Sequence, residues 1–199
     1  GKKAKIHIKT DTGMNRIGIR PDESGLQFIK KALSYEWIEA EGIFTHFARS
    51  DEADKTSAKH QNDQMGQFIK RAEAETGYRF PLRHCSNSAG ILELQEANMD
   101  MVRAGITLYG LWPSEEVSRD SISLHPLLSL KSRLVCVKEV EKGAQISYGG
   151  TYTAKKKMRV ATVPFCYRYA YPIVLSGKGF VLICGKRAPI LVRVCIDQF

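Results

Sequence analysis

KIHIKTD, at residues 5–11, alternates two isoleucines with polar side chains, and this period of two predicts a β-strand. Beyond Pro21 and Asp22 the apolar residues recur at a helical spacing instead. The members of this predicted helix face are Leu26, Ile29, Leu33 and Trp37. One strand followed by one helix is the repeating unit of an α/β fold.

The same unit recurs along the first half of the chain. GIFTHF at residues 42–47 predicts a second strand, and a second amphipathic helix is predicted to end at Gly77. The apolar face of that helix is formed by Met65, Phe68, Ile69 and Ala72. PLRHC at residues 81–85 predicts a third strand before a short helix over 88–94, and MVRAGI at 101–106 predicts a fourth. This alternation predicts a parallel sheet, either open or closed into a barrel.

The second half has a different composition. From residue 126 onward, β-rich runs are separated by glycine-containing turns and show no helical period. We therefore expect an α/β domain over 1–113, a polar linker over 114–125 and an all-β domain over 126–199. Four strand–helix units do not close an eight-stranded barrel. The sheet is expected to be open, or else the chain is part of a longer protein and its β domain is incomplete at Phe199.

The composition limits the class of protein. The 199 residues are 43% apolar and 26% charged, which excludes disordered, collagen-like and disulfide-scaffold proteins. No apolar run approaches the roughly 20 residues that span a bilayer, and the start of the chain lacks the apolar core of a signal peptide. The five cysteines stand singly, which disfavours disulfides and thiolate zinc sites. We expect a cytoplasmic protein with no membrane partner.

The formal net charge of +9 would attract phosphates, anionic ligands or nucleic acid. The basic residues are scattered, however, and their runs are short, as at 155–157 and 186–187. No interleaved aromatic platform or nucleic-acid-reading module accompanies them. An anion- or nucleic-acid-binding protein remains an alternative, although we expect no nucleic-acid partner.

Two predicted strand ends form a candidate phosphate site. In barrels, function collects at the C-terminal ends of strands. HCSNSAG at residues 84–90 ends one strand and opens a helix, and RAGI at residues 103–106 ends the next with a glycine that lets backbone N–H groups approach an anion. The simpler alternative is that Asn87 and Ser88 only cap the helix.

Ionisable side chains stand at the other predicted strand ends, namely Lys9, Asp11, Arg16 and His46. His46, His84 and Asp11 are conceivable metal ligands, but no close pair such as HxH is present, so we expect no metal. In SYGGTYTA at residues 147–154, two tyrosines flank a Gly-Gly turn that can present a phenol. A hairpin with packed aromatic side chains is the alternative interpretation.

Six separated motifs together resemble the bacterial alanine racemase family, whose members depend on pyridoxal phosphate. In chain order they are KIHIKTDTGMNRIGI, EGIFTHFARSDEAD, RHCSNSAG, MVRAGITLYGL, ISYGGTYTA and KRAPILVRVCIDQ. The resemblance implies an eight-stranded α/β barrel of the TIM type followed by an all-β domain, with this chain covering the later half of the barrel and part of the second domain. It also implies a head-to-tail homodimer, and a lysine that holds the cofactor as a Schiff base on a strand preceding residue 1.

The resemblance also implies which side chains are catalytic. Tyr148 matches the second catalytic base, which acts in the partner subunit's site, and His46 matches the histidine that hydrogen-bonds this phenol. Arg103 matches the arginine that faces the pyridine nitrogen of the cofactor. Because a guanidinium can only donate, the ring nitrogen stays unprotonated and the cofactor is a weaker electron sink, which favours racemisation over transamination. Racemisation needs one base on each face of the Cα–H, and Tyr148 supplies one face.

Binding roles follow from the same match. The implied cofactor-binding residues are His84, Ser88, Arg103, Gly105 and Ile106. The implied substrate-binding residues are Arg16, Tyr167 and Ile196. Lys9 matches a lysine that is carbamylated in some members of the family.

The sequence departs from the family pattern near its C-terminus. The family's GYADGYP reads CYRYAYP at residues 166–172, Val192 replaces a glycine, and Ile196 replaces the usual methionine. A side chain in place of glycine is costly wherever φ is positive or backbones approach closely. This segment is expected to be divergent or degraded.

The resemblance thus implies an alanine racemase, as a fragment or truncated relative, that interconverts L- and D-alanine for peptidoglycan. One alternative is an inactive remnant or assembly partner that lacks the Schiff-base lysine. Another is a racemase of broader range that accepts serine or lysine. A strand upstream of Gly1 that ends in a lysine followed by tyrosine and glycine would favour the active enzyme.

Overall fold

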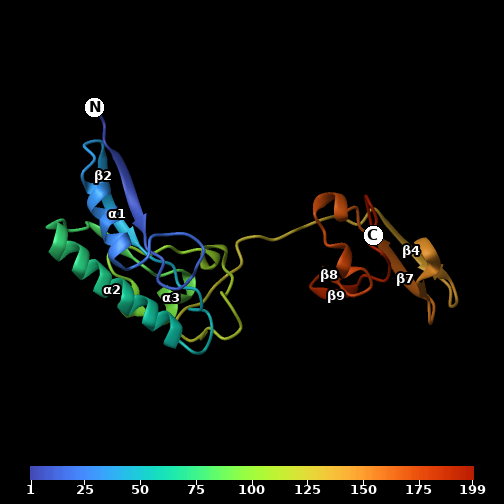
Figure 1. Cartoon of the computed structure of the whole chain (residues 1–199). Helices are drawn as coiled ribbons and strands as arrows, with labels where there is room; N and C mark the ends of the chain where they lie inside the picture. The colour runs from blue at the N-terminus through green and yellow to red at the C-terminus, as the bar shows by residue number, and fades with distance from the viewer. The chain divides into compact units, whose positions relative to one another are not determined.

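A parallel sheet organises the first of two units in the computed structural model, which describes residues 1–199 (Figure 1). The first unit is Gly1–Leu128 and the second is Ser129–Phe199. The elements of the first unit are β1 (Ala4–Lys9), α1 (Glu23–Leu33), β2 (Ile38–Phe44), α2 (Thr56–Thr76), β3 (Leu82–His84), α3 (Ser88–Glu93) and the 3-10 helices η1 (Gln95–Ala97) and η2 (Ile106–Tyr109). The α/β fold class, followed by a β region, is confirmed.

The three strands lie in the order β1-β2-β3 and are parallel throughout. One face of the sheet packs against α1 and α2, which lie side by side in Figure 1. Ile8 and Ile43 extend from the sheet into a core that also contains Ile29 of α1 and Phe68 of α2. The alternation of strand residues therefore leaves the opposite face free to carry polar side chains.

Local signals fix the ends of both long helices. The Asp22 carboxylate caps α1 by accepting from the Gly25 amide at 3.1 Å, and α2 ends at Gly77, whose φ is 68°. The predicted stop at Gly77 is confirmed. The placement of Trp37 on the first helix is wrong, because α1 ends at Leu33 and Trp37 lies beyond it with 65% of its surface exposed.

The predicted fourth strand over residues 101–106 does not form. Two backbone hydrogen bonds join this region to β3 and to the residues after it, one from the Asp100 amide to the Arg83 carbonyl at 3.1 Å and one from the Arg103 amide to the Ser86 carbonyl at 3.0 Å. No carbonyl of the segment accepts in return, so no ladder is completed. The segment still brings Arg103 beside the end of β3.

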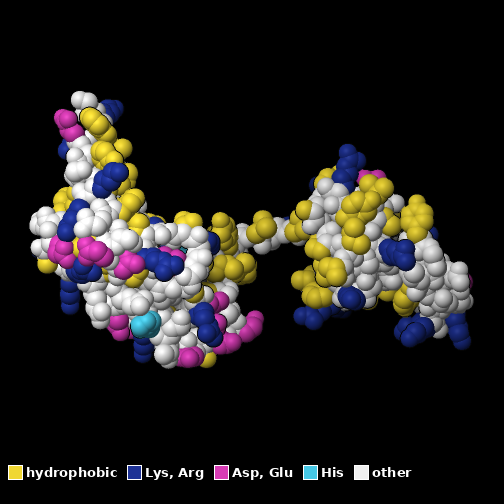
Figure 2. Space-filling view, viewed as in Figure 1, with side chains coloured by type: hydrophobic (Ala, Val, Ile, Leu, Met, Phe, Trp, Pro, Cys, Tyr) yellow, Lys and Arg dark blue, Asp and Glu magenta, His cyan; other side chains and the backbone are white.

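The second unit contains only short antiparallel strand pairs. Its sequence predicts β-structure, as observed, but the strands are shorter than the predicted β-rich runs. The pairs are β4 (Cys136–Val140) with β7 (Met158–Thr162), β5 (Gln145–Ile146) with β6 (Tyr152–Thr153), and β8 (Phe180–Ile183) with β9 (Lys186–Pro189). Three further 3-10 helices are η3 (Tyr148–Gly150), η4 (Tyr167–Tyr169) and η5 (Ile173–Leu175). The apolar residues after Pro189 are not in a strand, and many apolar side chains lie at the surface of this unit (Figure 2).

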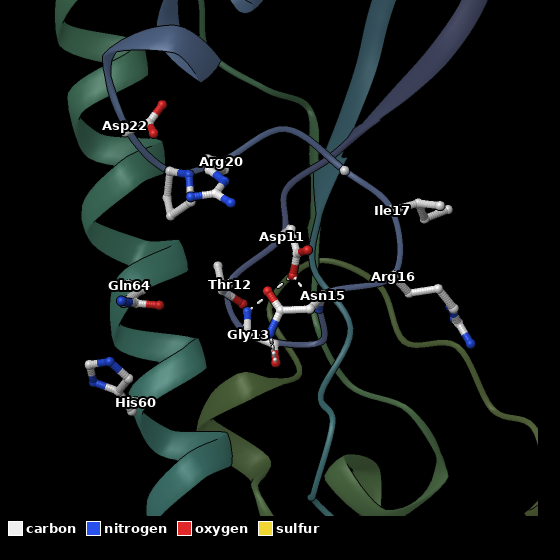
Figure 3. Close-up of a pocket in the computed structure, with 12 residues that line it drawn as sticks. Asp11, Thr12, Gly13, Asn15, Arg16, Ile17, Arg20, Asp22, His60 and Gln64 are labelled. Atoms are coloured by element: carbon white, nitrogen blue, oxygen red, sulfur yellow. Dashed lines mark hydrogen bonds between the residues drawn. The ribbon is translucent and has the colours of Figure 1, made fainter.

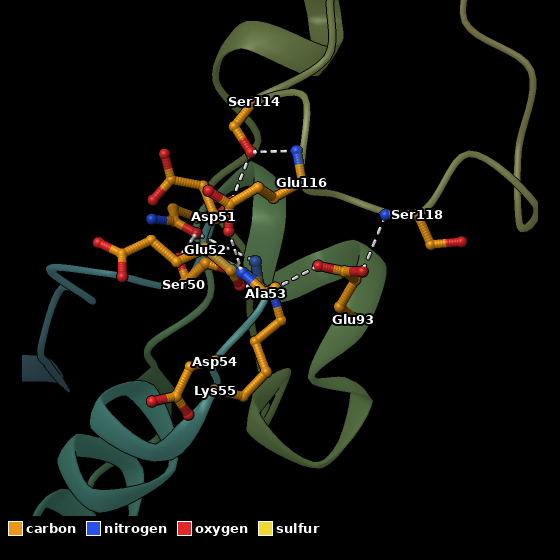
Figure 4. Close-up of polar contacts among 12 residues, drawn as sticks. Ser50, Asp51, Glu52, Ala53, Asp54, Lys55, Glu93, Ser114, Glu116 and Ser118 are labelled. Carbon is orange, nitrogen blue, oxygen red and sulfur yellow. Dashed lines mark hydrogen bonds and ion pairs between the residues drawn. The ribbon is translucent and has the colours of Figure 1, made fainter.

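The polar stretch after residue 113 begins as a tethered segment (Figure 4). The Glu116 carboxylate accepts from the Ala53 amide at 2.6 Å, and the Glu93 carboxylate accepts from the Ser118 amide at 2.9 Å. Glu93 also pairs with Lys55 at 2.6 Å. These bonds hold the segment against the loop before α2 and against α3, within the first unit.

None of the helices combines the length and the apolar character needed to cross a membrane. No group of three His, Cys, Asp or Glu side chains is arranged to hold a metal ion.

Candidate functional site

Three strand ends bring aromatic and basic side chains together on the polar face of the sheet. The ring of Phe44, the last residue of β2, stacks on the His84 ring at the end of β3, with centroids 4.8 Å apart and planes 6° apart. The Arg103 guanidinium carbon lies 4.9 Å from the Phe44 centroid, and the Lys9 Nζ at the end of β1 lies 5.9 Å from it. Parallel strands place their carboxyl ends at one edge, which is why residues so far apart in the sequence meet here.

Arg103 is held by a dense set of acceptors. Its Nη2 donates to the carbonyl oxygens of Thr45 at 2.7 Å and Cys85 at 3.1 Å, and contacts the Nδ1 of His46 at 3.2 Å. Its Nη1 donates to the Nδ1 of His84. A guanidinium carries five N–H donors, and the Nε–H of Arg103 has no acceptor within the chain. The side chain is thus fixed while one donor stays available for a ligand.

The surroundings of this arginine keep the histidines neutral at pH 7. Burial, together with the Arg103 charge, lowers the pKa of His84 to about 4. Burial also lowers the pKa of His46, with smaller contributions from Arg103, Arg16 and Lys9. The pKa of Lys9 is lowered in turn, mainly by burial. A site with this excess of positive charge and neutral imidazoles favours an anionic ligand.

The two predicted phosphate-binding strand ends meet at Ser88. Its Oγ accepts from the Gly105 amide at 2.9 Å, from the Thr107 Oγ1 at 3.1 Å and from the Thr107 amide at 3.4 Å. A hydroxyl oxygen has two lone pairs, so three donors exceed what Ser88 accepts well. An anion with several oxygens suits these converging donors better. Of the two residues in the helix-capping interpretation, Asn87 does cap α3, by accepting from the Gly90 amide. Ser88 instead contacts Gly105 and Thr107.

Arg16 lies in the loop that follows β1 (Figure 3). The Asp11 carboxylate shapes this loop by accepting from the Gly13 amide at 3.1 Å and from the Asn15 amide at 3.0 Å. Arg16 and His60 both line a depression of about 780 Å³, and Figure 3 shows the Arg16 side chain pointing away from His60. Arg16 makes no hydrogen bond within the chain, and its positive charge contributes to lowering the pKa of His46.

The candidate residues of the second unit lie at its surface. Tyr148 is 77% exposed in the turn between β5 and β6, and Ile196 is 55% exposed. Both line a cavity of about 620 Å³, whereas Tyr167 lies outside it. The predicted hairpin is confirmed, but packing of Tyr148 within it is wrong, because the glycine turn presents the phenol outward.

The divergent segment contains one strained position. Ala170 stands where the family pattern has its second glycine, and its φ of 63° is a left-handed conformation that a Cβ disfavours. Cys166, at the first glycine position, has an extended φ of −165° and is fully buried. Val192 is also buried. The cost of a left-handed backbone therefore falls on Ala170, whereas the Cys166 side chain is crowded against the Ile196 carbonyl.

Several site residues escape prediction from the sequence. Gln61 is buried on α2, where its Oε1 accepts from the Ala48 amide at 2.9 Å and its Nε2 donates to the His46 carbonyl at 3.1 Å. Its signal was a polar residue four positions before Met65 on an apolar helix face. Thr107 directly follows Ile106 in the motif MVRAGITLYGL, and this position could have indicated its contact with Ser88.

Comparison with known families gives two matches that together cover nearly the whole chain. Residues 1–113 match the family model described as "Alanine racemase, N-terminal domain", and residues 127–199 match "Alanine racemase, C-terminal domain". Among curated proteins, the alanine racemase of Desulforamulus reducens is 48% identical over 198 residues, and that of Clostridium perfringens SM101 is 46% identical over 198 residues. Both alignments span 100% of this chain, but 53% and 51% of the relatives.

Solved structures show the same similarity. The alanine racemase of Clostridium difficile 630 superposes with a TM-score of 0.92 and 40% identity, covering 99% of this chain and 51% of that one. The alanine racemase of Bacillus anthracis, solved with bound L-Ala-P, gives a TM-score of 0.87 and 36% identity, again with 51% of its length covered. The chain thus spans about half the length of the relatives it matches.

Proposed function

This chain belongs to the alanine racemase family, and from that premise we propose that it forms part of a pyridoxal-phosphate-dependent enzyme that interconverts L- and D-alanine. The observation that best supports this is the state of Arg103, whose Nη groups are held by protein acceptors while its Nε–H has none. A fixed donor of this kind suits a heterocyclic nitrogen that must accept a hydrogen bond and stay unprotonated.

The residues present fit the cofactor at two points. Ser88, Gly105 and Thr107 offer converging donors for its phosphate, with Ile106 between the last two. Arg103 offers its Nε–H to the pyridine nitrogen. When bound, pyridoxal phosphate supplies the electron sink that makes the alanine Cα–H acidic. The protein's contribution is to bind the phosphate, to hold the ring in one orientation and to limit its electron demand through an arginine that only donates.

His46 has a defined direction of hydrogen bonding. Its Nδ1 faces the donor Nη2 of Arg103, so the neutral ring carries its proton on Nε2 and donates from there. In the proposed enzyme this Nε2–H stabilises the phenolate form of Tyr148 supplied by a second copy of the chain in a head-to-tail homodimer. The Tyr148 phenolate would take the Cα proton from one face of alanine, and in the reverse direction its phenol would deliver a proton to that face, while a second acid–base group outside residues 1–199 would serve the opposite face. Arg16 would place the substrate carboxylate, and Tyr167 and Ile196 of the second unit are the other residues that we assign to substrate binding.

The remaining features are consistent with this assignment. The lowered pKa of Lys9 leaves a larger fraction of the neutral amine that carbamylation requires. Five unpaired cysteines suit the proposed cytoplasmic setting, in which D-alanine would serve peptidoglycan synthesis. The alternatives are a racemase that also accepts serine or lysine, and a catalytically inactive assembly partner.

The test uses the full-length protein, meaning this chain with all sequence that its gene encodes around it. Formation of D-alanine from L-alanine is measured with and without pyridoxal phosphate, and L-serine and L-lysine are assayed in parallel. We expect cofactor-dependent racemisation fastest with alanine. Borohydride treatment and peptide mapping should place the pyridoxyl group on a lysine outside residues 1–199. Cofactor binding without turnover would favour the inactive partner, and a single pyridoxyl-lysine at Lys9 would contradict the proposal.

A further inference from the structure

A chain of polar contacts leaves the site through the polar face of the sheet and ends at Glu41. The Nδ1 of His84, which accepts from Arg103, lies on one side of its ring, and the Nε2 on the other side is 2.8 Å from the Nδ1 of His7. The Nε2 of His7 is in turn 3.5 Å from the Oε2 of Glu41. The other carboxylate oxygen of Glu41 accepts from Lys5 at 2.6 Å.

Proton counting fixes the direction of every bond in this chain. Arg103 can only donate, so the Nδ1 of His84 must be bare and its proton must sit on Nε2. This Nε2–H donates to the Nδ1 of His7, which must therefore also be bare. The proton of a neutral His7 then sits on its Nε2, which faces the Glu41 carboxylate at 3.5 Å, a group that can only accept. One donor-only group and one acceptor-only group thus set both histidine tautomers.

The backbone is shaped to make this chain possible. In the pairing of β1 with β2, Ile6 is opposite Ala40 and His7 is opposite Gly42, so Glu41 is an extra residue in a β-bulge. The bulge puts Glu41 and Gly42 on the same side of the sheet as His7. A Cβ on Gly42 would overlap the Nδ1 of His7, so only glycine lets this ring cross β2 to reach β3.

We propose that His7 and Glu41 are positioning residues for Arg103, which they hold by fixing the tautomer of His84. Without an acceptor at His7, the buried Nε2–H of His84 has no partner. The alternative His84 tautomer places an N–H against the Arg103 Nη1, where two donors oppose each other. The orientation of Arg103, and with it the direction of its Nε–H, depends on this relay.

The direct test reads the tautomers by NMR. Histidine in the full-length protein is labelled with 15N, and two-bond 1H–15N correlations at pH 7.5 report which ring nitrogen carries each proton. We expect the Nε2–H tautomer for both His84 and His7, and a His84 Nε2–H that exchanges slowly with solvent. A wild-type His84 found in the Nδ1–H form, or one whose Nε2–H exchanges freely, would overturn the proposal without any variant being made.

Variants separate positioning from mere stability. His7→Phe keeps a ring but removes the acceptor, and the slow His84 Nε2–H signal should be lost. Glu41→Leu should release the His7 proton to exchange, whereas Glu41→Gln should retain it, because the amide oxygen still accepts. Glu39→Leu is the matched control on β2, since Glu39 approaches only Lys5, at 3.8 Å, and lies outside the relay. An unchanged His84 signal in His7→Phe would contradict the relay.

The consequence for catalysis rests on the proposed function and is measured separately. In His7→Phe the kcat for alanine should fall by roughly 10-fold, as happens when an orienting partner behind a site residue is removed. Glu39→Leu should leave kcat unchanged. If the full-length protein does not racemise alanine, the proposed function fails while the tautomer measurement still decides the relay. Full activity in His7→Phe with a disturbed His84 would show that Arg103 does not need this support.

Discussion

The two units differ in what they bury. The first has a continuous core beneath its parallel sheet, and two of its polar site residues are held in place, Arg103 by hydrogen bonds and His84 by stacking on Phe44. The second buries a small cluster formed by Cys166, Ile190 and Val194, and leaves Tyr148 almost wholly exposed. Rigid orientation is therefore a property of the first unit. The second unit offers reactive or contacting side chains whose partners lie outside its own fold.

This difference separates function from stability in a testable way. Residues of the first unit affect both, because the side chains that face a ligand also satisfy buried neighbours. Exposed residues of the second unit are expected to affect only function.

Tyr148→Phe in the full-length protein should lower kcat for racemisation in both directions by roughly 10²- to 10⁴-fold, the usual contribution of a positioned acid or base. The melting temperature should not change, since the side chain is 77% exposed and its hydroxyl bonds to nothing in the chain. Tyr152→Phe is the matched control in the same hairpin and should remain active. Turnover near wild type in Tyr148→Phe would remove Tyr148 from the mechanism.

The second prediction compares one isoleucine from each unit. Ile29 is fully buried between α1 and the sheet, so Ile29→Ala should lower the free energy of unfolding by about 2–5 kcal/mol. Ile173 is 56% exposed, and Ile173→Ala should change it by less than about 0.5 kcal/mol. Urea denaturation measures both. A large loss in Ile173→Ala would show that the exposed apolar surface is covered in the full-length protein, by a second copy or by another segment.

The third prediction concerns acid sensitivity of the first unit. His84 has its pKa lowered from 6.5 to about 4 in the folded state, so between these values the unfolded chain binds a proton that the folded one does not. Its contribution is complete above pH 6.5 and is lost as the pH falls towards 4, by about 2 kcal/mol between pH 6.5 and 5.

The measurement for His84 is urea denaturation at several pH values across this window. His84→Gln, although less stable at pH 7, should show a shallower decline in stability than wild type. His60→Gln replaces an exposed histidine on α2 and should keep the wild-type slope. Equal slopes in all three proteins would mean that His84 is accessible to protons when folded.

The success of prediction from sequence also differs between the two units. Periodicity found the helices and the first three strands, because apolar faces at a fixed spacing must meet one core, as Leu26 and Phe68 do. It failed at MVRAGI, where no strand forms, because a strand there needs backbone hydrogen bonds from adjacent strands and not only a suitable sequence pattern. The site residues named from the motif match were brought together in part, as Ser88 and Gly105 were. Gln61 and His7 were missed because their partners are distant in sequence and were unknown before folding.

The smallest expected effects are changes in the free energy of unfolding caused by replacing glycines. These should be equal in the two units, because they depend on the local backbone conformation alone. Gly77 ends α2 with φ 68°, and Gly185 sits in the turn between β8 and β9 with φ 76°; a Cβ at either would meet no atom within 4 Å. Replacing either by alanine should thus lower the free energy of unfolding by about 1 kcal/mol, because of the left-handed backbone alone.

Gly66 lies inside α2 with equally open space, and Gly66→Ala should instead raise the free energy of unfolding by about 0.5–1 kcal/mol. Denaturation of the three variants tests this. A Gly185→Ala loss well above that of Gly77→Ala would show that the β8–β9 turn contacts something beyond its own unit.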